Sequence, residues 1–255
     1  MDYETILFEA KGPVGVLTLN RPDRRNAINY QMRDELRRFF MERLADTDVR
    51  VIVITGAGKG FTSGLDIKDS TITSPENSYT PKMAYELQRL FSDIILFMRR
   101  CPQPIIGAIN GAAVGAGLSI AMACDIRLSA PEAKFSAAYI NIGTGGADMG
   151  SSWLFTRQVG IGNASRYLLT GDFFGPDEAM RIGFIQGIFE GDKLMEEAMN
   201  MANNMATKSP IGLRLTKEAL DRNVGGMSLE DAIRLEDRNQ AMCIAELAAL
   251  AKKAQ

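Results

Sequence analysis

Two apolar segments that each end in a run of glycines constrain the fold more than any other part of the sequence. VRVIVITG (49–56) leads into GAGKGFTSG (56–64), and PIIGAIN (104–110) leads into GAAVGAGLSIAMAC (111–124). A strand that ends in glycines leaves backbone N–H groups free to converge on an anion or on a polarised oxygen. The alternative is that each run is only a tight turn between packed elements.

Known phosphate-binding loops do not match these runs. Lys59 is followed by Gly60 rather than by Ser or Thr, so the P-loop pattern fails. Gly56, Gly58 and Gly60 alternate without the GxGxxG spacing of dinucleotide-binding folds. The residues therefore disfavour a nucleotide-binding fold.

The rest of the chain alternates short strands with amphipathic helices and then becomes helical. We expect further strands at 5–12, 14–20, 125–130, 134–137 and 185–191, and helices at 30–44, 82–99 and from about 151, 176, 193, 210 and 228. The polar stretch DSTITSPENSYTP (69–81) has no hydrophobic period and predicts a mobile surface loop. The pattern predicts an α/β core with a helical C-terminal appendage.

Composition disfavours several classes of partner. The 255 residues carry a net charge of −2 that is spread along the chain, so no nucleic-acid or anionic membrane surface is indicated. The N-terminus lacks a signal-peptide pattern, and no apolar run approaches the roughly 18 residues of a membrane span. Cys101, Cys124 and Cys243 are far apart and lack metal-like spacing, which indicates free thiols in a reducing compartment. We expect a cytoplasmic protein.

The chain contains no histidine. This excludes Ser-His-Asp and Cys-His nucleophile systems, and the usual zinc and iron sites that contain histidine. Any acid–base chemistry near neutral pH therefore depends on carboxylates, Tyr, Lys, Cys or bound water.

Taken together, the two glycine runs resemble the signatures of the crotonase (enoyl-CoA hydratase/isomerase) superfamily. FTSGLDI (61–67) is similar to F-x-x-G-x-D-[IL], and NGAAVGAGLSIAMACDIRLSA (110–130) resembles NGxAxGxGxxLAxxCDxRxA. The resemblance extends to LNRPDRRNAI (19–28), KFSAAYINIG (134–143) and SRYLLTGDFFGPDEAMRIGFIQGIF (165–189). These motifs occur in the right order over nearly the whole chain.

The resemblance implies a crotonase-like (ClpP/crotonase) α/β fold, a spiral of strand–strand–helix (ββα) units in two roughly perpendicular sheets. It also implies a spiral core over residues 1–195 and a helical trimerisation region over 196–255, assembled as a homotrimer or a dimer of trimers. Apolar residues of the last helices agree with burial against a partner: Ala232, Leu235, Met242, Leu247 and Leu250.

The resemblance further implies that the chain binds acyl-CoA thioesters, with no metal and no covalently bound cofactor. Carried over by position, the backbone amides of Ser63 and Ala116 form an oxyanion hole that polarises the thioester carbonyl. The residues implied to contact coenzyme A are Arg24, Arg25, Ala27, Gly64, Asp66, Ile67 and Lys252. Two alternatives are that Arg24 and Arg25 are a solvated surface pair and that Lys252 lies in a disordered tail.

The implied catalytic residues depart from the hydratase pattern. Ser119 and Tyr139 occupy the positions of the two hydratase glutamates, so the acid–base pair for ordinary hydration is missing. Asp148, in a glycine-rich stretch further on, resembles the aspartate that dienoyl-CoA isomerases and aryl-CoA dehalogenases carry at nearly this place, with an offset of one residue in the intervening loop. The dehalogenases also use a histidine. Tyr139 could donate a hydrogen bond or act as an acid, and Ser119 could position a water.

Two roles for Asp148 remain open. A desolvated carboxylate over the thioester has its pKa raised toward a useful base strength, whereas an N-cap residue accepts from the amides of the helix beginning near Ser151. We expect an enzyme that isomerises, or hydrates, an enoyl-CoA with Asp148 as the acid–base group. The alternatives are a specialised acyl-CoA hydrolase and a non-catalytic acyl-CoA-binding homologue.

Overall fold

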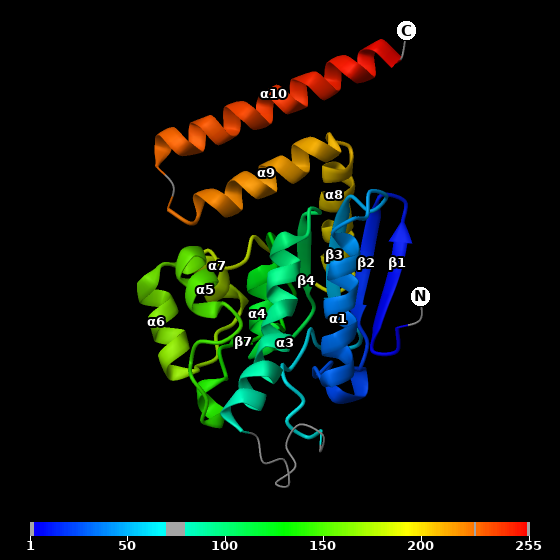
Figure 1. Cartoon of the computed structure of the whole chain (residues 1–255). Coiled ribbons are helices and arrows are strands. Elements are labelled where there is room, and N and C mark those ends of the chain that lie inside the picture. Colours follow the sequence, from blue (N-terminus) through cyan, green and yellow to red (C-terminus); the bar gives the residue numbers. More distant parts are fainter. Residues whose placement is uncertain (1–2, 70–79, 227, 254–255) are drawn as a thin grey trace.

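A six-stranded sheet forms the centre of the computed structural model, which describes residues 3–69, 80–226 and 228–253 (Figure 1). The first two strands form an antiparallel hairpin, and the others pair in parallel. The sheet has the order β1-β2-β3-β4-β6-β8, with β1 (Ile6–Lys11), β2 (Val14–Leu19), β3 (Val51–Gly56), β4 (Ile105–Ile109), β6 (Ile126–Ser129) and β8 (Gly187–Ile188). Parallel neighbours need crossover connections, and helices supply them here.

Short segments that follow the long strands pair with one another in a second layer. β5 (Ala113–Val114) pairs in parallel with β7 (Phe135–Ser136). Isolated bridges extend this layer, Ile28 to Leu65, Thr62 to Ala113 and Phe135 to Phe174. Long strand, short segment and helix therefore recur along the chain, as the predicted spiral of ββα units requires.

Burial on both faces explains why β3 is apolar. Val51 and Val53 pack in one cluster with α8 (Lys193–Ala206), while Ile52 and Ile54 belong to the larger core on the other face. That larger core includes residues of α1 (Tyr30–Arg43), α3 (Pro81–Arg100) and α4 (Ala116–Ala123). Parallel strands that are covered on both sides are apolar without alternation. The predicted boundary at 195/196 falls within α8, which packs on the sheet.

Four of the remaining helices begin within one residue of the predicted starts at 151, 176, 210 and 228. The remaining helices are η1 (Pro22–Arg24), η2 (Ile140–Ile142), α5 (Ser151–Val159), α6 (Ile161–Thr170), α7 (Pro176–Arg181), α9 (Pro210–Asn223) and α10 (Leu229–Lys253). Pro81, Pro176 and Pro210 stand in the first turn of α3, α7 and α9, where a missing N–H costs nothing. Most of the predicted loop 69–81 lies outside the described residues.

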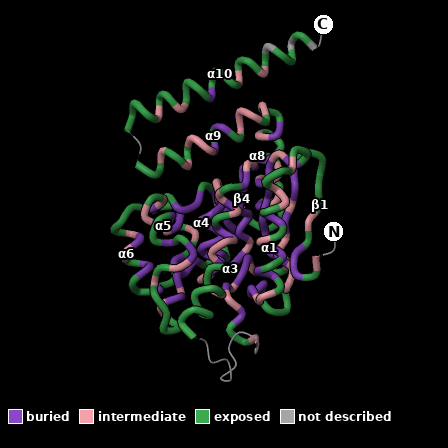
Figure 2. Tube along the Cα trace, in the orientation of Figure 1, coloured by how far each residue is buried: buried purple, intermediate pink, exposed green. Residues whose placement is uncertain are grey.

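The last two helices lie at one end of the molecule, with α10 lying across α9 (Figure 1). Most described residues of α10 are exposed in the single chain (Figure 2). Of the apolar residues expected to meet a partner, Ala232 and Leu235 are half-buried. Met242, Leu247 and Leu250 are 46%, 61% and 56% exposed.

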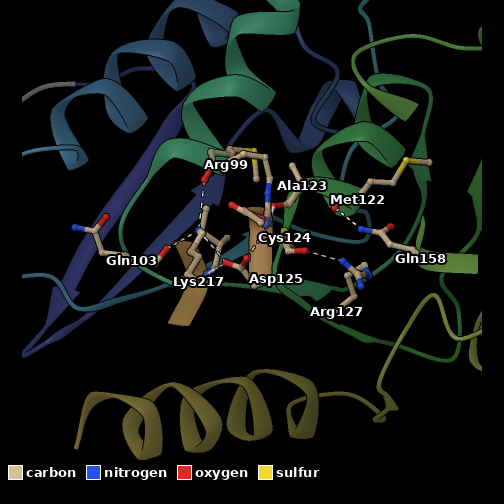
Figure 3. A network of polar contacts seen from close by, with 12 residues as sticks. Arg99, Gln103, Met122, Ala123, Cys124, Asp125, Arg127, Gln158 and Lys217 are labelled. Atoms are coloured by element: carbon tan, nitrogen blue, oxygen red, sulfur yellow. Dashed lines mark hydrogen bonds and ion pairs between the residues drawn. The ribbon is translucent and has the colours of Figure 1, made fainter. Parts of the chain in front are cut away.

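A cluster of buried and half-buried charged residues joins α9 to the core (Figure 3). Asp125, just before β6, pairs with Lys217 Nζ of α9 at 2.9 Å and with Arg99 of α3 at 2.8 Å. Arg99 also pairs with Asp221 of α9, and Lys217 donates to the Gln103 carbonyl at 2.8 Å. Burial would raise the pKa of Asp125, but Lys217 and Arg99 outweigh it and hold that pKa below its usual range. The cluster fixes the C-terminal helices on the sheet.

Candidate active site

A cavity of about 970 Å³ opens beside the two glycine runs. Its walls come from the loop after β2, the segments after β3 and β4, one face of α3 and the loop before α5. The predicted site residues that line it are Arg24, Arg25, Ala27, Ser63, Asp66, Ile67, Ala116, Tyr139 and Asp148. The fold thus brings together residues that are more than a hundred positions apart in the sequence.

Contact between the two runs depends on glycine at two positions. Gly64 has φ +84°, and a Cβ atom there would lie 2.4 Å from the Val114 carbonyl oxygen and 3.2 Å from the Ala116 nitrogen. A Cβ at Gly117 would lie 2.6 Å from the Thr62 carbonyl oxygen. Side chains at Gly64 and Gly117 would push the runs apart, so the glycines allow the amides of Ser63 and Ala116 to reach the same cavity.

The two amides differ in their hydrogen bonding. Ala116 is the first residue of α4, so its N–H lacks a carbonyl one turn back within the helix, and its N-cap, Gly115, has no side chain to offer. The Ser63 N–H donates to the Arg25 carbonyl at 3.0 Å. A ligand oxygen can therefore accept a hydrogen bond from the Ala116 amide directly. At Ser63 it must share the N–H with the Arg25 carbonyl or displace that carbonyl.

Asn26 is a structural residue that the sequence reasoning left unassigned. Its buried side chain donates to the carbonyls of Ala57 (2.9 Å) and Gly60 (2.8 Å), which ties the loop after β2 to the first glycine run. Arg25 and Asn26 both adopt positive φ, 53° and 54°. Asparagine tolerates this conformation better than most residues, and that tolerance is the signal that could have singled out Asn26 within RRNAI.

Asp148 lines the cavity and does not cap α5. The N-cap position of α5 is Gly150, and the Asp148 Oδ1 atom instead accepts from the Met149 amide (2.6 Å) and from Gln88 Nε2 of α3 (2.5 Å). The helix-cap interpretation is therefore wrong, because the glycine in the left-handed conformation (φ 81°) starts the helix two residues later. Gln88 was also missed, since one glutamine on an amphipathic helix gives no sequence signal.

The environment of Asp148 favours its protonated form. Burial raises the pKa of the half-buried carboxyl, and the hydrogen bond from the Met149 amide offsets only part of this effect. Within the part of the chain that the structure describes, no cation pairs with this carboxylate. A carboxyl with a raised pKa in a cavity is suited to accept and return a proton.

Ser119 and Tyr139 form a hydrogen-bonded pair beneath the cavity wall. The Ser119 Oγ and Tyr139 hydroxyl atoms are in direct hydrogen-bond contact, and Tyr139 also donates to the Gly115 carbonyl at 2.8 Å. Ser119 is fully buried, and Tyr139 is 5% exposed. Burial raises the pKa of the Tyr139 hydroxyl, so it stays protonated near neutral pH. These two groups satisfy each other rather than binding a free water.

The mouth of the cavity is basic. Arg24, Arg25 and Lys68 are exposed and line it beside Ile67. Asp66 also reaches the lining, but its carboxylate is 6% exposed and pairs with Arg21 at 2.8 Å. Lys252 is exposed on α10 and does not reach the cavity of its own chain.

The described residues offer no alternative centre based on a metal. No group of three or more Cys, Asp or Glu residues among them is arranged to hold an ion. Cys101 and Cys124 are buried, and burial raises their thiol pKa values to about 11 and about 12. Of the helices described, none is both long and apolar enough to cross a membrane.

Comparisons with known proteins agree with this fold and cavity. The family model for enoyl-CoA hydratase/isomerase matches residues 9–250. A probable enoyl-CoA hydratase of Mycobacterium bovis is 37% identical over 92% of this chain and 83% of its own. The 1,2-epoxyphenylacetyl-CoA isomerase of Escherichia coli is 32% identical over 86% of this chain and 82% of its own.

Solved structures are equally similar. The crystal structure of a probable enoyl-CoA hydratase/isomerase from Mycobacterium abscessus superposes with a TM-score of 0.87 at 35% identity, covering 98% of this chain and 96% of the other. A putative enoyl-CoA hydratase from Thermobifida fusca, solved in complex with CoA, gives 0.85 at 28% identity over 96% and 95%. The ββα spiral and the cavity between glycine runs define a protein of the crotonase superfamily. Within it, the chain belongs to the enoyl-CoA hydratase/isomerase family.

Proposed function

We propose that this chain moves a double bond in an enoyl-CoA through a thioester enolate, with Asp148 as the acid–base group. The amides of Ala116 and Ser63 hold the thioester oxygen and stabilise the enolate charge. Asp148 removes a proton from one carbon of the acyl chain and returns it to another. One carboxyl is sufficient for this reaction, because the same group accepts and donates the proton.

The observation that carries the proposal is the position of one half-buried carboxyl, with a raised pKa, in the same cavity as both amides. The residues at the two positions that the resemblance assigns to hydratase glutamates, Ser119 and Tyr139, cannot supply a carboxylate. Relatives carry both kinds of name, enoyl-CoA hydratase and 1,2-epoxyphenylacetyl-CoA isomerase, so the choice of isomerisation rests on these residues.

Coenzyme A is the proposed carrier of the acyl group. Its phosphates fit the exposed Arg24, Arg25 and Lys68 at the mouth, and its apolar segments fit Ile67 and Ala27. Asp66, held by Arg21, shapes this end of the cavity rather than contacting phosphate, because two negative groups would repel each other. A relative solved in complex with CoA supports this assignment.

The experiment measures exchange of the α-protons of butyryl-CoA with deuterium oxide by NMR. Butyryl-CoA has no double bond, so exchange reports enolate formation without isomerisation or hydration. We expect wild-type protein to catalyse exchange and Asp148→Asn to reduce the rate by at least about 100-fold, the lower end of the range for one acid–base group. Binding of butyryl-CoA, measured by calorimetry, should persist in the variant.

A matched control is Asp172→Asn, which removes an exposed carboxylate outside the cavity. Undiminished exchange in Asp148→Asn would show that Asp148 is not the base. Binding without exchange in wild type would identify a non-catalytic acyl-CoA-binding protein. Release of free CoA would identify a hydrolase, and conversion of a 2-enoyl-CoA to a 3-hydroxyacyl-CoA would identify a hydratase.

The proposal includes assembly through the C-terminal helices. Leu220, Ile244 and Leu247 on α9 and α10 are 62%, 64% and 61% exposed in the single chain, so these apolar side chains are available to a partner. A trimer would cover it and could bring Lys252 of one protomer toward a neighbour. Sedimentation equilibrium should give three or six times the chain mass, and a monomer would contradict this part of the proposal.

A further inference from the structure

The Tyr139 hydroxyl contacts the peptide group that carries the proposed oxyanion donor. It donates to the Gly115 carbonyl oxygen at 2.8 Å. The carbonyl of Gly115 and the N–H of Ala116 belong to one planar peptide unit and share its resonance. A donor on the oxygen side of this unit therefore acts on the N–H that faces the cavity.

Hydrogen counting gives the direction of the chain of hydrogen bonds. Tyr139 has one hydroxyl proton, and the Gly115 carbonyl can only accept, so this proton goes to Gly115. The Ser119 hydroxyl proton has two possible acceptors, the Tyr139 oxygen in the short contact and the Asp148 backbone carbonyl at 3.3 Å. Because the tyrosine proton goes to Gly115, the much shorter contact with Tyr139 makes Ser119 the donor to the tyrosine oxygen. The chain runs from Ser119 through Tyr139 to Gly115 and ends at the Ala116 N–H.

The Gly115 carbonyl accepts a second hydrogen bond, from the Ser119 amide at 3.1 Å. Both lone pairs of this oxygen are thus occupied. Hydrogen bonds in such chains strengthen one another by about 10–30% per bond. Gly115 itself has φ 54° and ψ −121°, a conformation outside the allowed regions of other residues, so its peptide orientation depends on these contacts.

We propose that Tyr139 is a positioning residue that orients and polarises the Gly115–Ala116 peptide, and that Ser119 supports it. This inference rests on the proposed function, because the Ala116 amide matters only if a thioester oxygen accepts from it. The pair at the two hydratase-glutamate positions then acts on the oxyanion hole and not on water or a proton of the substrate.

The test uses butyryl-CoA labelled with ¹³C at the thioester carbonyl and measures its stretching frequency by isotope-edited infrared spectroscopy. In wild-type protein the bound carbonyl should absorb at lower frequency than in water, because the oxyanion hole polarises it. We expect Tyr139→Phe to lose about half of this lowering and Ser119→Ala to lose less. The kcat for α-proton exchange should fall roughly tenfold in Tyr139→Phe, less than the 10²–10³ for deleting a whole oxyanion donor.

Comparing the change in kcat with the change in the dissociation constant distinguishes a positioning role of Tyr139 from a simple packing role. The bound thioester oxygen is only polarised, whereas it becomes negatively charged in the transition state, so the dissociation constant for butyryl-CoA should change by less than about twofold. The matched control is Tyr167→Phe, which removes a hydroxyl bonded to Glu178 at 2.9 Å outside the cavity. It should leave both the carbonyl frequency and kcat unchanged.

Three outcomes decide the matter. A loss of the frequency lowering in Tyr139→Phe, with Tyr167→Phe unchanged, supports the inference. Full wild-type lowering in Tyr139→Phe overturns this inference and leaves the proposed function standing. Absence of any lowering in wild type with butyryl-CoA bound overturns the proposed oxyanion hole and this inference with it. If Tyr139→Phe does not fold, Ser119→Ala, which removes the start of the chain, gives the same decision.

Discussion

A half-buried aspartate lies near each end of the short helix α4 (Ala116–Ala123), and the two aspartates have opposite electrostatic surroundings. Just after its C-terminus, Asp125 is held by Lys217 at 2.9 Å and Arg99 at 2.8 Å. At its N-terminus, the donors to the Asp148 carboxylate among the described residues are both neutral, the Met149 amide and Gln88. The charge that holds the structure together is paired, and the charge proposed to react is left without a cation.

The pKa directions follow from this difference in partners. Burial alone raises the pKa of both carboxyl groups. At Asp125 the two cations outweigh burial and the pKa falls, whereas at Asp148 one amide does not and the pKa rises. Sequence position alone does not separate these roles, since both are single aspartates beside a helix.

The largest expected effect comes from removing the paired charge. Among the described residues, Asp125→Asn leaves the buried Lys217 and the half-buried Arg99 with Asp221 alone to balance them. Breaking a buried pair in this way costs about 3–5 kcal/mol of unfolding free energy. Urea denaturation followed by circular dichroism measures this loss.

The control for this prediction is Asp172→Asn, which neutralises an exposed carboxylate and should leave the midpoint unchanged. A loss in Asp125→Asn no larger than in the control would mean that the cluster is not a stabilising contact. Asp125 would then no longer differ from Asp148 as a structural carboxylate.

Much of the fold could be predicted, because its signals are local. The apolar run at 49–56, the prolines that begin α3, α7 and α9, and the change to a helical tail each depend on neighbouring residues. The family resemblance predicted that the two glycine runs lie against each other, and the structure gives the physical reason for this contact. Gly64 and Gly117 leave no room for a Cβ atom between the runs.

The hydrogen bonding within the cavity could not be predicted. The Ser63 amide donates to the Arg25 carbonyl only because Arg25 and Asn26 adopt positive φ, which an arginine rarely does. Gln88 reaches Asp148 across 60 positions of sequence. Such contacts depend on where whole elements pack, and a single residue type carries no signal for them.

An intermediate effect is expected at the cavity end, where backbone contact rather than charge holds the parts together. Gly64→Ala places a methyl group 2.4 Å from the Val114 carbonyl oxygen at a φ of +84°. Strain of this kind costs about 1–3 kcal/mol, and separation of the runs should also abolish α-proton exchange. The matched control is Gly60→Ala, where a Cβ meets nothing within 4 Å. Equal losses in the two variants would contradict the role assigned to the contact.

The smallest expected effect is a gain in stability on mutation of Asp148, opposite in sign to the loss expected for Asp125. The Asp148 pKa in the folded state lies above the ordinary aspartate value of 3.8. As pH rises from 3.8 toward the folded-state pKa, Asp148 loses its proton in the unfolded chain before it does so in the folded chain. The carboxylate therefore lowers the free energy of unfolding once it is ionised in both states. Asp148→Asn removes this penalty while its side-chain oxygen can still accept from Gln88 and Met149. We expect a small rise in the unfolding midpoint at neutral pH.

The pH dependence of the two variants distinguishes a reactive carboxylate from a structural one. For Asp125, whose pKa is lowered, the stabilisation is present above 3.8 and is lost as pH falls through the folded value. Unfolding midpoints measured from pH 7 into acid should therefore lie below wild type for Asp125→Asn and above it for Asp148→Asn, and both should approach wild type in acid. A lower midpoint for Asp148→Asn at neutral pH would make Asp148 a structural carboxylate like Asp125. A raised midpoint together with lost exchange means that the protein keeps an unpaired carboxylate at a cost in stability, and catalysis is then the reason that the α4 N-terminus differs from its C-terminus.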